Sequence, residues 1–254
     1  MSIDDKKIEK LFNYRKIPYV LKDLAIINSK ALLSDLYELQ RNIYALDHYL
    51  ESNWKLSSSN LNKHWKAIYN TLEKLGYNRS QAQDLCKHIK KYELHEIQLR
   101  EGKRPYRLSM EYFYYYKSCD VRLMRQILVD KSIKTKSKLA DWRYFDLATE
   151  VNDDIEDVFE DMETINANAF LILINERSVN EAHDKFDAFL KHIEHKSSLR
   201  RSKVNTKAFN QIHNWTVEII ADTSKLMLEN LKKIKSESLE TRGKLEIHSS
   251  RAEV

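Results

Sequence analysis

Glycine and proline are scarce in this chain, and this scarcity limits its possible folds more than any other feature. Its 254 residues include three glycines and two prolines. A sheet protein of this length needs many more glycines for its turns, and Gly76, Gly102 and Gly243 lie too far apart in the sequence to form a Rossmann or P-loop fingerprint. Apolar residues recur with helical spacing along most of the chain. The sequence therefore predicts an all-helical protein.

Short polar breaks divide the helical pattern into segments. A basic, partly ordered lead-in is expected up to Pro18, and no linker, change of composition or internal repeat divides the rest. We therefore expect a single domain over 1–240, followed by a polar, mobile tail over 241–254. The expected helices cover 20–31, 33–53, 58–75, 79–101, 106–130, 139–163, 165–176, 178–196 and 205–238.

The composition narrows the class of protein. A hydrophobic fraction of 42% supports a core, which argues against overall disorder. No uninterrupted apolar stretch is long enough for a membrane-spanning helix, and the N-terminus lacks an apolar signal segment. A cytoplasmic protein without an integral membrane segment is therefore expected. The two cysteines, Cys86 and Cys119, form no CxxC pair and suit a reducing compartment. The net charge of +5 permits a phosphate-bearing partner without requiring one.

One stretch is strongly acidic. NDDIEDVFED (152–161) holds six carboxylates among its ten residues, and no Lys or Arg occurs from Tyr144 to Glu176. Like charges one helical turn apart cost a few tenths of a kcal/mol per pair, roughly, so a divalent cation such as Mg²⁺ is one explanation and a solvated acidic face is the other. Helical spacing puts Asp146, Glu150, Asp153, Asp157 and Glu160 or Asp161 on one face, with Ala148, Val151, Ile155, Val158, Phe159 and Met162 opposite.

This stretch carries a family resemblance. Asp153-Asp154-Ile155-Glu156-Asp157 follows a DDxxD pattern and is preceded by WRYFDLA (142–148). It resembles the second aspartate-rich helix of class I isoprenoid synthases, which include trans-prenyltransferases, squalene and phytoene synthases and terpene cyclases. The cyclase metal triad, with steps of four residues, is also matched in spacing, although neither matching set has Ser or Thr at its middle position. Those sets are Asn152, Glu156 and Glu160, and Asp153, Asp157 and Asp161.

A weaker match lies upstream. ALDHYLES (45–52) resembles the first acidic motif of the family, with Asp47 and Glu51 four residues apart and His48 in place of a second Asp. The resemblance implies a helical bundle with the active site at its centre and several Mg²⁺ ions held from two walls. Ordinary surface positions for Asp47 and Glu51 are the alternative. The implied metal ligands are Asp47, Glu51, Asp153, Asp154, Asp157 and Asp161.

The segment between the two motifs adds basic and aromatic candidates. Lys117-Ser118 is similar to a Lys-Thr pair of prenyltransferases, and Arg107 matches a diphosphate-sensing arginine of terpene cyclases, 46 residues before Asp153 (153 − 46 = 107). The resemblance implies catalytic roles for Arg107, Lys117 and Tyr115. Substrate contacts are implied for Tyr44, Phe113 and Phe145 together with Arg107 and Lys117, while plain core packing stays open for the aromatic residues.

These matches imply a Mg²⁺-dependent terpene cyclase that ionises an allylic prenyl diphosphate in an aromatic pocket. A homodimer and a monomer are both compatible with them. The alternatives are a prenyltransferase, in which YRKIPY (14–19) would bind a second diphosphate, and its non-catalytic subunit. Two further alternatives are a helical scaffold and a nucleic-acid-binding protein. The latter would bind phosphates through the basic clusters 131–138, 195–203 and 232–238. Since these clusters lie mainly at helix ends, no nucleic-acid partner is expected.

Overall fold

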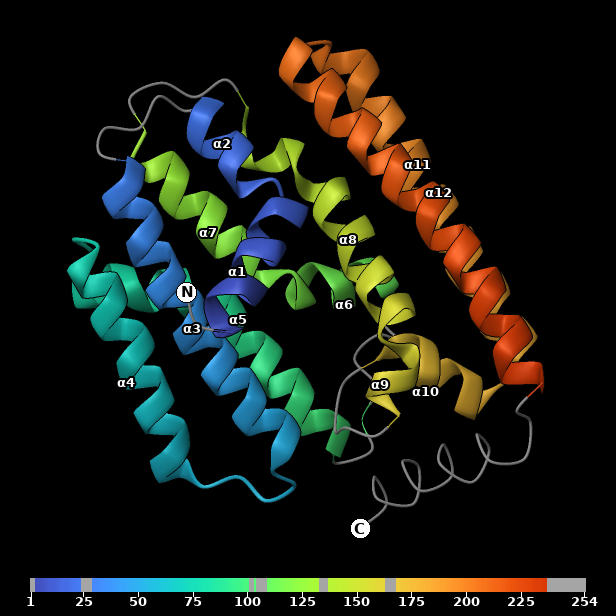
Figure 1. The fold of residues 1–254 in the computed structure, drawn as a ribbon, viewed down its shortest axis with the longest axis horizontal. Coiled ribbons are helices and arrows are strands. Elements are labelled where there is room, and N and C mark those ends of the chain that lie inside the picture. Colours follow the sequence, from blue (N-terminus) through green and yellow to red (C-terminus); the bar gives the residue numbers. More distant parts are fainter. Residues whose placement is uncertain are drawn as a thin grey trace. The chain divides into compact units, whose positions relative to one another are not determined.

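The computed structural model describes residues 3–23, 29–100, 103, 109–132, 137–162 and 168–236. Within these residues all regular secondary structure is helical (Figure 1), which confirms the predicted all-helical class. None of the helices in the described ranges is long and apolar enough to span a membrane. The helices are α1 (Ile3–Tyr14), α2 (Ile17–Asp23), α3 (Ser29–Ser52), α4 (Ser58–Lys74), α5 (Arg79–Arg100), α6 (Met110–Lys117), α7 (Cys119–Asp130), the 3-10 helix η2 (Leu139–Asp141), α8 (Arg143–Glu156), α9 (Val158–Asp161), α10 (Ala169–Glu176), α11 (Val179–Val204) and α12 (Lys207–Ser236).

The chain divides into two compact units that alternate along the sequence. Unit 1 comprises 1–93 and 119–139, and unit 2 comprises 94–118 and 140–254. The sequence has no linker-like composition at the points where the chain passes from one unit to the other. This explains why the sequence suggests a single domain over 1–240. That interpretation stays a prediction, and the expected tail over 241–254 lies outside the described residues.

Unit 1 begins with two helices where the sequence suggested a partly ordered lead-in. That expectation was wrong because α1 and α2 have apolar faces that are buried, including Ile8 on α1 and Ile17 on α2, both with no exposed surface. Pro18 does not interrupt α2 because it lies in the first turn, where its missing N–H is not needed. Lys16, with φ of 60°, makes the turn between the two helices.

The remaining helices of unit 1 pack around these two. α3 lies against α4, α1 lies against α2 and α3, and α2 lies against α7. The buried Arg125 of α7 donates a hydrogen bond from Nη2 to the carbonyl oxygen of Arg15 at 2.9 Å. This bond ties the turn after α1 to a helix that follows 110 residues later.

Unit 2 is organised around α8, which contacts α6, α10, α11 and α12. Residues 145–152 of α8 are buried without exception, because helices cover it on several sides. α11 and α12 form a long hairpin (Figure 1), and Asn205 turns the chain between them with a left-handed φ of 40°. Asn tolerates this conformation better than most residues.

The face of α12 that enters the core follows a heptad pattern with polar members. Buried positions alternate in steps of four and three residues, as in helix pairs with side chains interlocked. Thr223 donates to Asn152 Oδ1 at 2.8 Å and Asn230 donates to the carbonyl oxygen of Ile155 at 2.6 Å. These bonds fix the register of α12 against α8. The positions are Phe209, His213, Thr216, Ile220, Thr223, Met227, Asn230 and Ile234.

Two of the expected helices are interrupted. The segment 106–130 contains α6 and α7, which belong to different units and are separated at Ser118. The segment 139–163 contains η2, α8 and α9, with a break at Asp157. Apolar periodicity continues through both interruptions because each following helix also buries apolar residues, so the pattern alone could not locate them.

Candidate functional site

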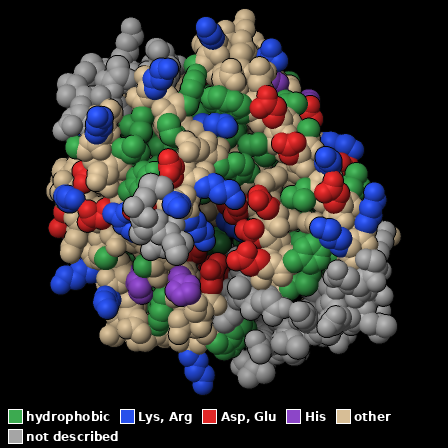
Figure 2. All heavy atoms as spheres, viewed as in Figure 1, with side chains coloured by type: hydrophobic (Ala, Val, Ile, Leu, Met, Phe, Trp, Pro, Cys, Tyr) green, Lys and Arg blue, Asp and Glu red, His purple; other side chains and the backbone are tan. Residues whose placement is uncertain are grey.

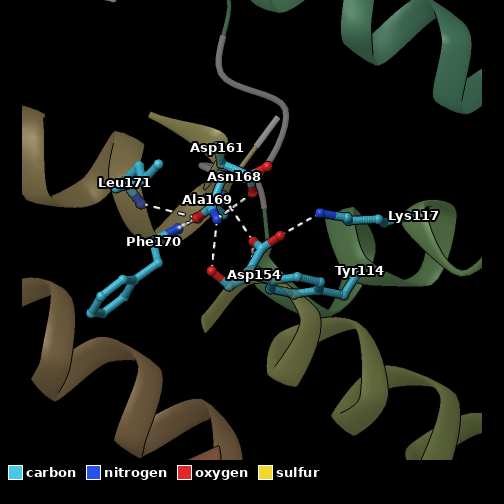
Figure 3. A network of polar contacts seen from close by, with 8 residues as sticks. All are labelled: Tyr114, Lys117, Asp154, Asp161, Asn168, Ala169, Phe170 and Leu171. Carbon is cyan, nitrogen blue, oxygen red and sulfur yellow. Dashed lines mark hydrogen bonds and ion pairs between the residues drawn. The ribbon is translucent and has the colours of Figure 1, made fainter. Parts of the chain in front are cut away.

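The centre of the candidate site is Asp154, a carboxylate with no exposed surface near the end of α8. Its Oδ2 accepts hydrogen bonds from the Tyr114 hydroxyl at 2.6 Å and from the backbone amide of Ala169 at 2.9 Å. Its Oδ1 accepts from the ammonium group of Lys117. Figure 3 shows that Tyr114 and Lys117 reach Asp154 from α6 while Ala169 lies at the start of α10. Both carboxylate oxygens are therefore already used by protein donors, which suits a structural residue better than a metal ligand.

Lys117 supplies the positive charge that the acidic stretch lacks. Its side chain is 10% exposed. Burial alone would lower the pKa of Lys117, but the negative charges of Asp154, Asp153, Asp161 and Glu150 outweigh burial and raise it. The group is thus an ammonium ion at neutral pH. Burial and the charge of Asp154 also raise the pKa of Tyr114, so its hydroxyl keeps the proton that it donates.

Asn168 links this network to the next helix. Its side-chain amide donates to the carbonyl oxygen of Asp154 at 2.7 Å and to Oδ2 of Asp161 at 2.8 Å. Its Oδ1 accepts from the amides of Phe170 and Leu171, each at 3.1 Å, and so caps the N-terminus of α10. Sequence reasoning missed Asn168, although an Asn before an apolar helical run is a recognised capping signal.

The acidic stretch is not one continuous helical face. α8 ends at Glu156 and α9 begins at Val158, with Asp157 between them. The expected acidic face is helical as far as Asp157, whose amide bonds to the carbonyl oxygen of Asp153 at 2.9 Å. Its carboxylates have different surroundings because several helices enclose α8. The opposite apolar side is confirmed for Ala148, Val151, Ile155 and Val158, which are all fully buried.

The carboxylates fall into three environments. Asp146, Glu150, Asp154 and Asp161 are buried, Asp153 and Asp157 are partly exposed, and Glu156 and Glu160 are exposed. Figure 2 shows acidic side chains gathered over α8 and α9 on one face of the molecule. Asp153 and Asp157 are therefore accessible to a ligand and close enough to the buried carboxylates to interact with them electrostatically.

Asp153 and Asp157 are set apart by their lack of side-chain hydrogen bonds within the described ranges, and Asp157 also by its pKa. Among the described residues, neither carboxylate has a hydrogen bond or an ion pair. Burial raises the pKa of Asp157 to about 7, with further contributions from the charges of Asp153, Asp161, Glu160 and Glu156. A carboxylate with a pKa raised by its neighbours is a candidate for cation binding or proton transfer.

The donor set fits Mg²⁺ in one specific way. In the described part of the chain no group of three or more His, Cys, Asp or Glu side chains is arranged to hold a metal, so a closed protein cage is not supported there. Mg²⁺, however, is usually bound through one or two carboxylates, with phosphate and water oxygens as the other ligands. Asp153 and Asp157 supply that kind of partial site.

The other predicted site residues are placed differently. Tyr44, Asp47 and Glu51 lie on α3 in unit 1, so their joint action with the acidic helix stays a prediction. Lys7 Nζ lies 5.3 Å from the centroid of the Tyr44 ring. Arg107 falls outside the described residues.

The predicted aromatic residues lie mainly in the core of unit 2. Phe113 and Phe145 have no exposed surface, and Phe145 packs edge-on against Trp142 with ring centroids 5.6 Å apart. Tyr115 is partly buried, and the guanidinium of Arg143 lies 4.9 Å from the centroid of its ring. Core packing therefore accounts for Phe113 and Phe145, and a substrate contact for either stays a prediction.

Replacing Asp157 with asparagine is expected to stabilise the protein at alkaline pH. Because the folded-state pKa of about 7 lies above the ordinary value of 3.8, the folded protein holds this proton more tightly than the unfolded chain. Stability therefore falls as pH rises between these two values. We expect Asp157→Asn to raise the free energy of unfolding by about 1–2 kcal/mol near pH 8, allowing for screening of a partly exposed group, and to change it little near pH 4.

Urea denaturation at several pH values measures this effect. The exposed Glu156→Gln variant is the matched control, since it removes one charge from the same helix end. Equal pH dependence in both variants would contradict the assignment of the raised pKa to Asp157.

Comparisons with protein-family models, with curated proteins and with solved structures identified no match. The acidic helix itself is therefore the feature from which a function can be inferred. Its geometry combines a buried ion pair, two partly exposed carboxylates and a helix break.

Proposed function

We propose that the chain is a Mg²⁺-dependent class I terpene synthase, in which the end of α8 binds the diphosphate of an allylic prenyl diphosphate. The observation that carries this proposal is the pair Asp153 and Asp157, which are partly exposed and whose carboxylates have no hydrogen bond or ion pair among the described residues. Asp153 is close enough to the ammonium group of Lys117 to help raise its pKa, and the two aspartates lie in a sequence context that resembles the second metal-binding helix of this superfamily.

Each residue has a distinct part in the proposed chemistry. Asp153 and Asp157 would hold Mg²⁺ through their oxygens, and the bound ion would neutralise the diphosphate as it leaves. Lys117 contributes a fixed positive charge next to the acidic cluster, in a site of low exposure where such a charge acts strongly. Asp154 and Tyr114 hold Lys117 and the start of α10 in place and need not contact the ligand.

The N-terminal segment favours a cyclase over a prenyltransferase. A chain-elongating enzyme needs a second, basic site for its second diphosphate, and YRKIPY (14–19) was the candidate segment. Arg15 is only 4% exposed, and its carbonyl oxygen accepts the bond from Arg125. A buried arginine in the middle of this segment is poorly placed to bind a diphosphate from solution.

The basic cluster 195–203 gives little support to the nucleic-acid alternative. Arg200 donates two hydrogen bonds to Oδ1 of the buried Asp141, at 3.0 Å and 2.5 Å. Its charge is therefore engaged within unit 2 and is less available to a phosphate backbone.

Thermal melting with Mg²⁺ and pyrophosphate tests the proposal. We expect a rise in melting temperature of about 5 °C or more that requires both ligands together, as for ligands well above their dissociation constants. The rise should disappear in Asp153→Asn/Asp157→Asn. The variant Glu156→Gln/Glu160→Gln is the matched control, because it removes the same charge from exposed neighbours and should keep the rise.

Product analysis follows a positive result. Incubation with prenyl diphosphates of increasing length should release pyrophosphate and a hydrocarbon or alcohol, without chain extension. Absence of any stabilisation in the native protein would overturn the proposal. Equal loss in both double variants would indicate general electrostatics instead of a site.

A further inference from the structure

The helix pair formed by α4 and the first part of α5 carries most of the net positive charge of the chain. Residues 58–93, all of which the structure describes, belong to unit 1. They include seven Lys or Arg and three Asp or Glu, so their net charge is +4 (7 − 3) with neutral histidines. The net charge of the whole chain is +5. A short segment of unit 1 therefore provides nearly all of the excess charge.

α4 and α5 lie side by side, and two cations cover the seam between them. Trp65 Nε1 on α4 donates to Glu93 Oε2 on α5 at 2.6 Å. Lys90 Nζ lies 5.2 Å from the ring centroid of Trp65 and 5.4 Å from that of Tyr69. The guanidinium carbon of Arg79 lies 4.0 Å from the Tyr69 centroid. Because both aromatic residues are buried while Lys90 and Arg79 are exposed, the rings hold these two cations at the surface.

Further lysines extend the positive surface over both helices. Lys63 and Lys66 are three residues apart on α4, and Lys87 lies three residues before Lys90 on α5. Residues with this spacing share one face of a helix. Lys63, Lys66 and Lys87 are exposed and form no ion pair with any described residue. Their charges are therefore available to a partner.

The acidic residues of this segment neutralise little of the surface. Glu93 is partly buried and accepts the bond from Trp65, and Glu73 accepts a hydrogen bond from Arg79 at 3.3 Å. Asp84 is exposed one turn before Lys87. Most of the uncharged exposed residues carry amides or hydroxyls, which also bond to phosphate oxygens. They include Asn62, Asn70, Ser80 and Gln83.

The chemistry of this surface favours a duplex over other anionic partners. None of the large apolar side chains of residues 58–93 is exposed, whereas helices at a membrane surface insert apolar residues and protein interfaces have an apolar core. Single strands are bound largely through accessible aromatic rings, but Trp65 and Tyr69 are buried. A duplex presents a dense row of phosphates that cations and polar donors can bind without apolar contacts.

We propose that the exposed face of α4 and α5 binds the phosphate backbone of double-stranded nucleic acid without sequence preference. Its free cations are lysines, which act as point charges and lack the planar fork with which arginine reads guanine. This function is separate from the proposed synthase activity and does not depend on it. The expectation of no nucleic-acid partner was drawn from runs of basic residues elsewhere in the chain. It does not cover this face, whose lysines are spaced by the helical period.

Anisotropy of short labelled DNA and RNA duplexes of mixed sequence, titrated with the full chain, tests the proposal. Five cations would release counterions, so log K should fall with log salt concentration with a slope of about −4 to −5 between about 50 and 200 mM. The variant Lys63→Gln/Lys66→Gln/Lys87→Gln should weaken binding about tenfold or more at the lower salt concentration and reduce the slope by about three. Asp84→Lys should tighten binding and steepen the slope by about one.

The matched control removes three exposed charges from α11 and α12. In Lys185→Gln/Lys207→Gln/Lys225→Gln the dissociation constant should stay within about threefold of the native value, because screened charges away from the contact act weakly. Circular dichroism checks that each variant is folded. If the first triple variant does not fold, Lys66→Gln/Lys87→Gln replaces it, with an expected slope reduction of about two.

The outcomes distinguish the kinds of partner. Binding of both duplexes, or of one alone, supports the proposal and identifies the preferred backbone. A native protein that binds neither duplex near 50 mM salt would overturn the proposal, as would equal weakening in the two triple variants, since binding would then follow overall charge. Tighter binding to phosphatidylserine vesicles than to either duplex, lost in the first triple variant, would also overturn it and assign the face to a membrane surface.

Discussion

Replacing Lys117 with methionine is expected to lower the free energy of unfolding by about 3–5 kcal/mol, the cost of leaving one partner of a buried ion pair without its countercharge. Asp154 has no exposed surface and would keep only the Tyr114 hydroxyl and the Ala169 amide as donors. Methionine retains most of the apolar volume of the lysine side chain. The loss of unfolding free energy therefore measures the effect of removing the positive charge. Urea denaturation near pH 7 measures it.

The control is a Lys–Asp pair at the surface of the same unit. Lys191 bonds to Asp187 at 2.6 Å and its side chain is 73% exposed. Lys191→Met should cost less than about 1 kcal/mol, as is usual for exposed pairs. Similar losses in the two variants would contradict the view that burial makes the Lys117 pair important.

Replacing Asn168 with alanine is expected to cost about 2–3 kcal/mol, since one buried side chain makes four hydrogen bonds. The variant loses the cap on α10 and the donors to the Asp154 carbonyl and to Asp161. The Asp161 carboxylate, which is 6% exposed, would then lack this donor. Thermal and urea unfolding of the purified variant measure the loss.

Ser178→Ala provides the comparison. Ser178 caps α11 by accepting a hydrogen bond from the amide of Glu181 at 3.1 Å, and it is partly exposed. Its loss should cost about 1 kcal/mol, as for an ordinary cap. If Asn168→Ala cost no more than this, its bonds to the acidic helix would contribute nothing to stability.

The helical class could be predicted because it depends on local properties. Few turn residues and a persistent helical period leave little choice of secondary structure. The helices at the start of the chain could not be predicted as easily, because many charged residues surround Ile8 and Phe12, which are four residues apart and buried. Charged residues on one face do not prevent a short helix from burying the other.

The acidic stretch can be recognised in the sequence, but the arrangement of its side chains cannot. The acidic stretch is visible in the sequence, yet the residues that bind Asp154 come from 37 and 40 residues earlier in the chain and from α10. The rule that a helix has one apolar and one polar face also fails for α8, because several helices enclose it. Which carboxylates are buried could therefore be learned only from the tertiary structure.

The heptad pattern of α12 is present in the sequence but is difficult to recognise there. Its polar members, including Thr223 and Asn230, weaken the apolar signal at the positions where their hydrogen bonds matter most. A buried polar residue in such a pattern commonly fixes the register between helices. Polar interruptions in a heptad are thus useful markers of specific contacts.

The alternation of the two units along the chain affects how the protein forms during synthesis. α2 packs against α7, which follows the whole of α6 in the sequence. At roughly 5–20 residues per second, the ribosome releases the first five helices several seconds before α7. Unit 1 is therefore incomplete while the first part of unit 2 emerges, and the part of α2 that packs against α7 is uncovered during this time. A nascent chain stopped near Glu93 would present that face to chaperones or to other nascent chains.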